Sequence, residues 1–419
     1  MSRPAGETRR VTISAASLGL FQTLSLVLPL LTLPLLGRSL GVELFGQIML
    51  AQFIVFFGVV FIDSGFNVES QRRVAVATDE HDKLQALLDN LVARTLIAGG
   101  VTMVVLAVGA LMPGLPMWMV WVSLLHLAGT LIFPQWWFAA RDEGFRMGVV
   151  SIVGRITSTL LVLSLVRSPA DACVALLAAS SATLISGLMV WPKLLRRFRS
   201  HDRDFNWQGY KGFIRAVRPV IFSGFVASSA QSIPTVVLGW MSGPQHVGLF
   251  AAADRLTRAA AHLSSVMGLP ILNVAARLHA NSAQDLHQFS RRLMLVTAGL
   301  CVGGAAVLIM LSKPVIHLLY GDRFLESVFV LQLLTVWLGL NVLRTIWLTL
   351  EWKARGLLNQ LAQLQWQEGF SVIAVSAMGA WLNGATGVAG GLVLSELGLL
   401  IRLLAMHRTP DLAELRASR

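Results

Sequence analysis

Residues 95–140 contain no Asp, Glu, Lys or Arg over 46 consecutive positions: TLIAGGVTMVVLAVGALMPGLPMWMVWVSLLHLAGTLIFPQWWFAA. A helix that crosses a bilayer needs roughly 20 apolar residues, so this run is long enough for two crossings. Pro113, Gly114 and Pro116 lie near its middle, and this combination is typical of a turn. The run therefore predicts two membrane-spanning helices joined by a short turn.

The same pattern recurs along the whole chain. Charge-poor apolar stretches of spanning length lie at residues 13–36, 44–62, 95–112, 116–139, 147–166, 172–192, 219–241, 248–270, 293–312, 327–350, 362–381 and 386–405. The eighth is interrupted by Asp254, Arg255 and Arg258, and the eleventh by Glu368. The predicted fold class is an all-α integral membrane protein with about 12 transmembrane helices.

The overall composition agrees with this class. Of the 419 residues, 55% are hydrophobic and 13% are charged, with a mean hydropathy of +0.67. Soluble domains carry roughly 25% charged residues, so this chain could not cover a water-facing surface. The only cysteines, Cys173 and Cys301, lie in apolar runs. We expect them to be buried thiols rather than a disulfide or a metal site.

The basic residues are distributed unevenly between the predicted loops. With the N-terminus in the cytoplasm, 25 of the 34 Lys and Arg residues fall on the cytoplasmic side. Only Arg38, Arg167, Lys313 and Arg323 fall in outer loops. Cytoplasmic loops of membrane proteins are enriched in Lys and Arg, so the pattern predicts a multi-pass protein with both termini cytoplasmic. It also explains the net charge of +12 without a nucleic-acid partner.

The chain divides into two predicted halves. We expect an N-terminal six-helix bundle at residues 1–192, a cytoplasmic basic linker at 193–218 and a C-terminal six-helix bundle at 219–419. The sequence GVELFG at residues 41–46 is partly repeated as HVGLFA at residues 246–251. Two halves of the same orientation predict pseudo-symmetric bundles around a central cavity. The linker is either a short helix on the inner membrane surface or a solvated loop.

Enzyme signatures are absent from the sequence. It has no P-loop, no H-E-x-x-H and no Cys/His cluster, so we expect neither an enzyme nor a cofactor or metal site. Asp202 and Asp204 form a D-x-D sequence like that of metal-dependent glycosyltransferases, but they lie in a short basic loop. We interpret them as solvated charges.

The candidate site residues are the ionisable groups at membrane depth, which are costly there and usually functional. Guanidinium groups stay charged and can bind phosphate through two hydrogen bonds. We therefore predict a cationic, substrate-binding cavity lined by Arg155, Arg255, Arg258 and Arg344. The candidates for coupling or gating are Asp63, Asp254 and Glu396.

Five stretches resemble the Wzx-type O-antigen flippases, the polysaccharide-transporter branch of the multidrug/oligosaccharidyl-lipid/polysaccharide exporter superfamily. They are LPLLGRSLG (residues 33–41), DSGFN (63–67), PQWWFAARDEGFR (134–146), VGLFAAADR (247–255) and YGDRF (320–324). They occur in the family's order along nearly the whole chain. Ala140 is a departure, since it stands where that family usually has glycine.

The resemblance implies a flippase in a bacterial inner membrane. Its substrate would be a polyprenyl-diphosphate-linked oligosaccharide, moved from the cytoplasmic to the periplasmic leaflet by alternating access for O-antigen, capsule or exopolysaccharide assembly. Membrane lipids, other polysaccharide-assembly proteins and H+ or Na+ as coupling ion are its expected partners.

Three alternatives stay open at this point. A drug or cation antiporter of the same superfamily would favour an acidic cavity over four deep arginines. A membrane polysaccharide polymerase or ligase usually needs a sizeable outer loop, and the outer loops here are short. A lipid-II flippase would also favour arginine, and the sequence separates it poorly from the main reading.

Overall fold

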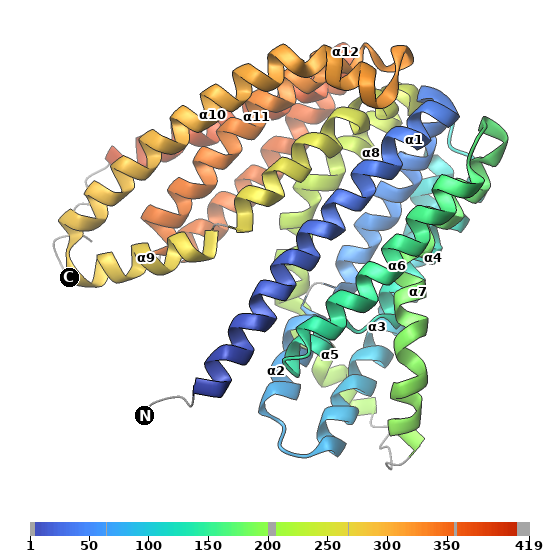
Figure 1. The fold of residues 1–419 in the computed structure, drawn as a ribbon, viewed down its shortest axis with the longest axis vertical. Helices are drawn as coiled ribbons and strands as arrows, with labels where there is room; N and C mark the ends of the chain where they lie inside the picture. Colours follow the sequence, from blue (N-terminus) through green and yellow to red (C-terminus); the bar gives the residue numbers. More distant parts are fainter. Residues whose placement is uncertain (1–4, 64, 200–206, 267, 356–357, 409–419) are drawn as a thin grey trace. The chain divides into compact units, whose positions relative to one another are not determined.

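The protein is all-helical in the part that the structure describes. The computed structural model describes residues 5–63, 65–199, 207–266, 268–355 and 358–408, and no strand occurs among them (Figure 1). The α-helices are α1 (Ala5–Asp63), α2 (Phe66–Val76), α3 (Glu80–Leu111), α4 (Met117–Ile132), α5 (Gln135–Ala140), α6 (Gly144–Leu165), α7 (Ala172–Arg199), α8 (Trp207–Val266), α9 (Gly268–Asn281), α10 (Ala283–Tyr320), α11 (Ser327–Trp347) and α12 (Leu358–Arg408). Among the described residues, eight helical stretches are long and apolar enough to cross a membrane. The predicted class, an all-α membrane protein, is confirmed.

Three of the long helices each contain two predicted spans. α1 is interrupted at Gly41, α8 at Gly243, and α12 at Asn383 and Gly384. Most described residues of the twelve predicted spans therefore lie in helix, with a break at residues 133–134 between α4 and α5. Gly41 has φ 81° and ψ 173°, and Gly243 has φ 83° and ψ 173°. This backbone conformation is essentially restricted to glycine. The turns after the first and seventh spans thus share one local conformation, beside the partial sequence repeat.

The chain forms two compact units, Met1–Ser232 and Ile233–Arg419, and the division falls inside α8. It lies beyond the predicted start of the second half because the first part of α8 packs onto the first unit. There, Phe213 and Val217 of α8 form a buried cluster with Phe66 of α2 and Ala93 of α3. The six-plus-six division of the spans stays a prediction.

The linker between the predicted halves is largely helical. Residues 200–206, with the D-x-D sequence, lie outside the described residues, and α8 begins directly after them. Tyr210 and Phe213 are buried in the first unit, where the Phe213 ring lies 5.8 Å from Phe66 and 4.4 Å from the Arg73 guanidinium. These two aromatic side chains therefore contact protein rather than lipid.

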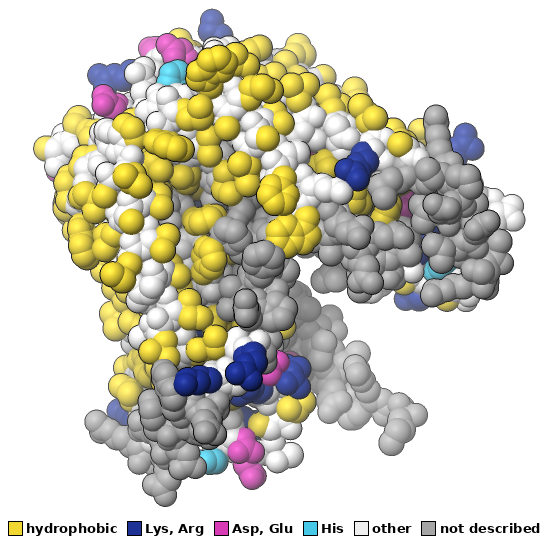
Figure 2. All heavy atoms as spheres, turned by 180° about the vertical axis from the view of Figure 1, so that it is seen from behind, with side chains coloured by type: hydrophobic (Ala, Val, Ile, Leu, Met, Phe, Trp, Pro, Cys, Tyr) yellow, Lys and Arg dark blue, Asp and Glu magenta, His cyan; other side chains and the backbone are white. Residues whose placement is uncertain are grey.

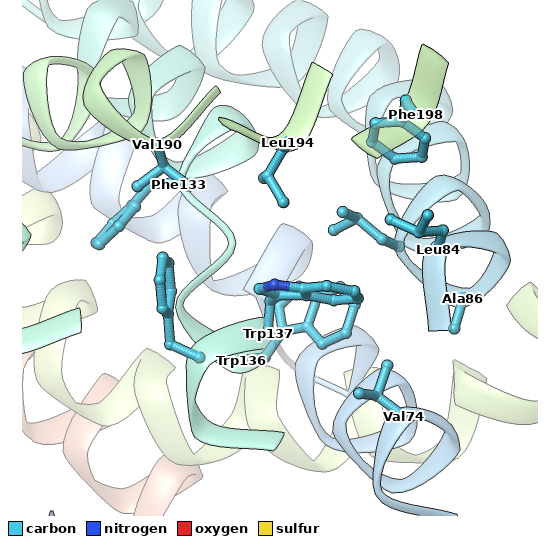
Figure 3. Packing of buried hydrophobic residues seen from close by; sticks show 11 residues of the cluster. Val74, Leu84, Ala86, Phe133, Trp136, Trp137, Val190, Leu194 and Phe198 are labelled. Carbon is cyan, nitrogen blue, oxygen red and sulfur yellow. The ribbon is translucent and has the colours of Figure 1, made fainter. Parts of the chain in front are cut away.

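The core of the first unit includes residues from the stretch PQWWFAARDEGFR (134–146). Trp136, Trp137 and Phe138 of α5 are buried among side chains of α2, α3 and α7 (Figure 3). In Figure 3 the two tryptophans occupy the middle of the cluster, between Leu194 of α7 and Val74 of α2. At the edge of this cluster, Glu80 of α3 accepts hydrogen bonds from Arg141 and Arg197. Apolar packing and ion pairs together join the ends of α3, α5 and α7.

Apolar side chains cover much of the outside of the molecule. On the face in Figure 2, hydrophobic atoms predominate and charged groups gather in a few places. Leu300, Met310 and Trp381 are more than 70% exposed, which suits contact with lipid tails. The expectation of buried thiols is wrong, since Cys173 is exposed and Cys301 is partly exposed. A cysteine in an apolar stretch of sequence need not be buried inside the protein, because in a membrane protein apolar stretches can also face lipid.

Candidate functional site

Arg155 has no charged partner among the residues whose side chains the structure describes. It lies near the middle of α6, a helix that packs against α1 and α7, and its side chain is half-buried. Close by, Ser158 Oγ donates a hydrogen bond to the carbonyl oxygen of Ala178 in α7, at 2.7 Å. In the described part of the chain, Arg155 forms neither an ion pair nor a hydrogen bond. A guanidinium at this depth can bind an anion through two hydrogen bonds, so Arg155 stays a candidate.

Asp63 is paired within the same unit. Arg94 Nη2 donates to Asp63 Oδ1 at 2.6 Å and to the carbonyl oxygen of Thr130 at 2.8 Å. The Arg94 side chain is 2% exposed, whereas that of Asp63 is 41% exposed. The pair joins the end of α1 to α3 and α4, so Asp63 has a structural partner that the sequence analysis did not predict.

Three charged residues in the second half of α8 lie together in the second unit, and we call Asp254, Arg255 and Arg258 the α8 cluster. Arg258 Nε donates to both carboxylate oxygens of the fully buried Asp254, at 2.8 and 2.7 Å. The Arg258 guanidinium also lies 5.8 Å from the centre of the Trp337 ring. Arg255 is in electrostatic reach of Asp254, Arg258 and the buried Tyr320. The α8 cluster carries two positive charges and one negative charge.

Arg344 and Glu396 also lie together, and Glu368 completes their group, which we call the Arg344 cluster. Arg344 donates Nη1 and Nη2 to the two carboxylate oxygens of Glu368, at 3.1 and 2.8 Å, and Nε to Glu396. Arg344 and Glu396 are buried. One guanidinium therefore donates to two carboxylates, and the cluster has a net charge of −1 when both carboxylates are ionised.

The fold of α12 explains why the two glutamates meet. The helix turns back at Asn383 and Gly384, so the residues before and after this turn form two antiparallel arms. The arms touch at intervals of four residues, at Gly379–Gly387, Val375–Gly391 and Ser371–Ser395. A Cβ at Gly387 would lie 1.9 Å from the Gly379 carbonyl oxygen, so only glycine permits this approach. Glu368 and Glu396 flank the last of these contacts and reach Arg344 of α11 from both arms.

The seven predicted site residues thus occupy four separate environments. The structure brings Asp254, Arg255 and Arg258 together and joins Arg344 to Glu396, while Asp63 and Arg155 lie elsewhere. Arg94 as a partner and Glu368 as a member of a site were not predicted from the sequence. Arg94 directly precedes the charge-free run at residues 95–140, and Glu368 stands out in the sequence only as an interruption of a span.

Comparisons with known proteins place these features in a family. Residues 11–274, more than half of the chain, match the family described as "Polysaccharide biosynthesis protein". The chain is 25% identical over 334 residues to a protein of Escherichia coli (strain K12) named "Putative O-antigen transporter", covering 76% of this chain and 77% of that one. It is 22% identical over 318 residues to a protein of the same name from Shigella dysenteriae, covering 72% and 78%.

Solved structures share the fold. A lipid II flippase MurJ in an inward closed conformation aligns with a TM-score of 0.73 at 14% identity, covering 94% of this chain and 87% of that one. A multidrug resistance MATE family transporter of the MOP superfamily, in an inward-facing conformation, aligns with a TM-score of 0.71 at 16% identity, covering 93% and 96%. At these identities the likeness concerns the fold. Because the family match extends over more than half of the sequence, the chain belongs to the polysaccharide biosynthesis protein family.

Proposed function

We propose that the protein is a flippase that moves a polyprenyl-diphosphate-linked oligosaccharide from the cytoplasmic to the periplasmic leaflet by alternating access. The family match, the names of the relatives and the transporter fold support a transport role over an enzymatic one. O-antigen, capsule or exopolysaccharide assembly would use such a substrate.

The observation that carries this proposal is the uncompensated charge of Arg155. A cation in the middle of an apolar helix needs an anion or water, and the described residues supply no anion to it. A diphosphate offers oxygens in the geometry that a guanidinium binds through two hydrogen bonds. A drug-cation antiporter has no use for a free cation at this depth.

The other predicted residues take roles that follow from their partners. Arg255 and Arg258 are the next candidates for the diphosphate, since the α8 cluster keeps one positive charge in excess of Asp254. Arg344 is a weaker candidate because two glutamates occupy its donors. Asp63 and Glu396 remain the candidates for gating and coupling, with H+ or Na+ as the ion.

The proposed setting is the bacterial inner membrane, with both termini in the cytoplasm and the halves divided at the basic linker of residues 193–218. The 25 cytoplasmic Lys and Arg residues support this topology. Single cysteines in the turn of residues 113–116 should react with an impermeant thiol reagent in intact cells, and cysteines near Arg199 should not. The reverse labelling pattern would overturn the topology.

Reconstitution tests the transport activity directly. In proteoliposomes that hold a fluorescent polyprenyl-diphosphate oligosaccharide, the protein should move the lipid between leaflets, as read by an impermeant quencher. Arg155→Ala should slow this movement by about ten- to a hundredfold. Arg323→Ala, which removes an exposed arginine from the turn after α10, is the matched control and should move the lipid normally. Movement of lipid II but not of the polyprenyl-diphosphate oligosaccharide would replace the proposal by the lipid-II alternative.

A further inference from the structure

The Arg344 cluster differs from the other buried ion pairs of the second unit in its charge balance. Asp254 pairs with Arg258, and Glu351, in the π-helical segment Leu348–Lys353 that follows α11, pairs with Arg355 at 2.5 Å. Each of these carboxylates therefore has an arginine of its own. Glu368 and Glu396 share one arginine. No other charged group acts on Glu396 in the described part of the chain, where Arg344, Glu368 and the amide of Asn341 are its polar partners. One negative charge is left over inside a membrane segment.

A surplus charge at this depth is costly, so the cluster should bind a monovalent cation. Arg344 already occupies three of the four carboxylate oxygens, two on Glu368 and one on Glu396. A sodium ion needs several oxygen ligands, whereas only one carboxylate oxygen of the cluster has no hydrogen bond from Arg344. A proton needs only one oxygen.

The two glutamates are not equivalent hosts for that proton. Glu368 holds Arg344 through both of its oxygens, and its side chain is 21% exposed. Glu396 accepts a single hydrogen bond from Arg344, and its side chain is 4% exposed. The more deeply buried and less fully paired carboxyl is the one that is better kept neutral.

We propose that Glu396 carries a proton because Glu368 competes with it for Arg344. Glu368 is then a positioning residue, since it acts on Glu396 only through the guanidinium. When Glu396 releases its proton to water, Arg344 is drawn toward the new carboxylate and away from the partly exposed Glu368, which water can solvate. The link from this switch to transport rests on the proposed function, whereas the proton on Glu396 does not.

Infrared spectroscopy of the protein in lipid nanodiscs tests the proton site without transport. At neutral pH the wild type should show the carbonyl band of a buried, protonated carboxyl group, and Glu396→Gln should remove it. Glu368→Gln should remove it too, although Glu396 is still present, because Arg344 is then free to stabilise the Glu396 carboxylate. Glu351→Gln, which changes a glutamate with its own arginine, should leave the band unchanged.

Glu368→Asp is the control for a loss of the band that is caused by misfolding of Glu368→Gln. It keeps the competing carboxylate, so the band should persist in this variant even if Glu368→Gln folds poorly. A wild-type protein without the band, or a folded Glu368→Gln variant that retains it, would overturn the proposal. Removal of the band by sodium at constant pH would also overturn it, since sodium would then be the cation.

A transport arm separates this inference from the proposed function. In proteoliposomes, a pH gradient should change the rate of lipid movement for the wild type and for Glu351→Gln, and should not change it for Glu368→Gln or Glu396→Gln. If the protein moves no polyprenyl-diphosphate lipid but the infrared pattern holds, the proposed function fails and the proton site stands. If lipid movement occurs and the infrared pattern is absent, the proton site fails alone.

Discussion

Arg155 and Arg258 are both arginines in apolar helices, and of the two, Arg258 alone has a carboxylate partner among the residues that the structure describes. Their alanine variants should therefore fail in different ways. Arg155→Ala removes an uncompensated charge, so we expect normal membrane abundance and a loss of export of about ten- to a hundredfold, the worth of hydrogen bonds to a charged group. Arg258→Ala leaves Asp254 buried without a partner, which costs about 3–5 kcal/mol, so abundance should fall as well.

Immunoblots of membranes, read beside an export assay, check both expectations. Arg258→Ala combined with Asp254→Asn should recover abundance, because the buried charge is gone, and should still export poorly. Arg155→Lys should recover export only in part, since an ammonium lacks the guanidinium fork. Wild-type export by Arg155→Ala would remove this residue from the substrate path.

Single residues were predictable from the sequence as charges at membrane depth, but their partners on other helical segments were not. The spacing of Asp254 and Arg258, one helical turn apart, indicates a pair within one helix. The contacts of Arg344 with Glu368 and Glu396 cross between separate segments, 24 and 52 residues away along the chain. A single sequence carries no signal for such contacts, which is why Arg344 appeared as a free cation.

The hairpin of α12 makes a prediction at the level of a secondary-structure element. Leucine at position 387 would force the two arms apart, because a Cβ there would lie 1.9 Å from the Gly379 carbonyl oxygen. In a chain without Cys173 and Cys301, cysteines at positions 371 and 395 should form a disulfide readily, since the two serine oxygens are 2.7 Å apart. Gly387→Leu should suppress this cross-link and destabilise the protein by about 1–3 kcal/mol.

Two controls make the hairpin experiment specific. Gly390→Leu adds the same side chain where no atom lies within 4 Å of a Cβ, so the cross-link should form as before. Cysteines at positions 371 and 394 should not cross-link, because Leu394 is 64% exposed and faces away from the partner arm. Equal cross-linking with leucine at 387 and at 390 would mean that the arms are not in close contact.

The long helices were predictable because their apolar runs are long and free of charges. The breaks at Gly41, Gly243 and Gly384 fall between predicted spans, where glycine indicates a turn. The π-helical segment Leu348–Lys353, which follows α11, was not predictable. Tertiary packing of its buried Leu348, Leu350 and Trp352 selects that conformation, and no local pattern in the sequence specifies it.

For the whole molecule, the predicted number of spans and the predicted sidedness of the charges come from the order of apolar runs and basic residues along the sequence. The place where the chain divides into compact units does not. The basic linker at residues 193–218 suggested a boundary there, but the first part of α8 buries Phe213 and Val217 in the first unit. The start of α8 belongs to the first unit because a few of its apolar residues are buried there. That burial depends on tertiary contacts, which the sequence alone does not show.

The driving force is a property of the whole transport cycle. A diphosphate head carries one or two negative charges, and moving it outward from a negative interior is favourable by roughly 2.3 kcal/mol per charge per 100 mV. Arginines that bind the head would not cancel this contribution, because they stay on the protein and return to their starting positions. A proton that leaves Glu396 toward the cytoplasm while the substrate moves out would add to it, and a proton that moves with the substrate would subtract from it.

We therefore predict that an imposed inside-negative potential speeds outward lipid movement in proteoliposomes even without a pH gradient, and that collapsing the potential slows it. A potassium gradient with valinomycin sets the potential, and the quencher assay gives the rate. In Glu396→Gln the rate should still depend on the potential through the charge of the diphosphate. Only the contribution of the proton to this dependence should be lost. If the wild-type rate does not depend on the potential, each substrate crosses with its charge compensated by a co-moving ion. If Glu396→Gln then makes the rate depend on the potential, that ion is the proton on Glu396.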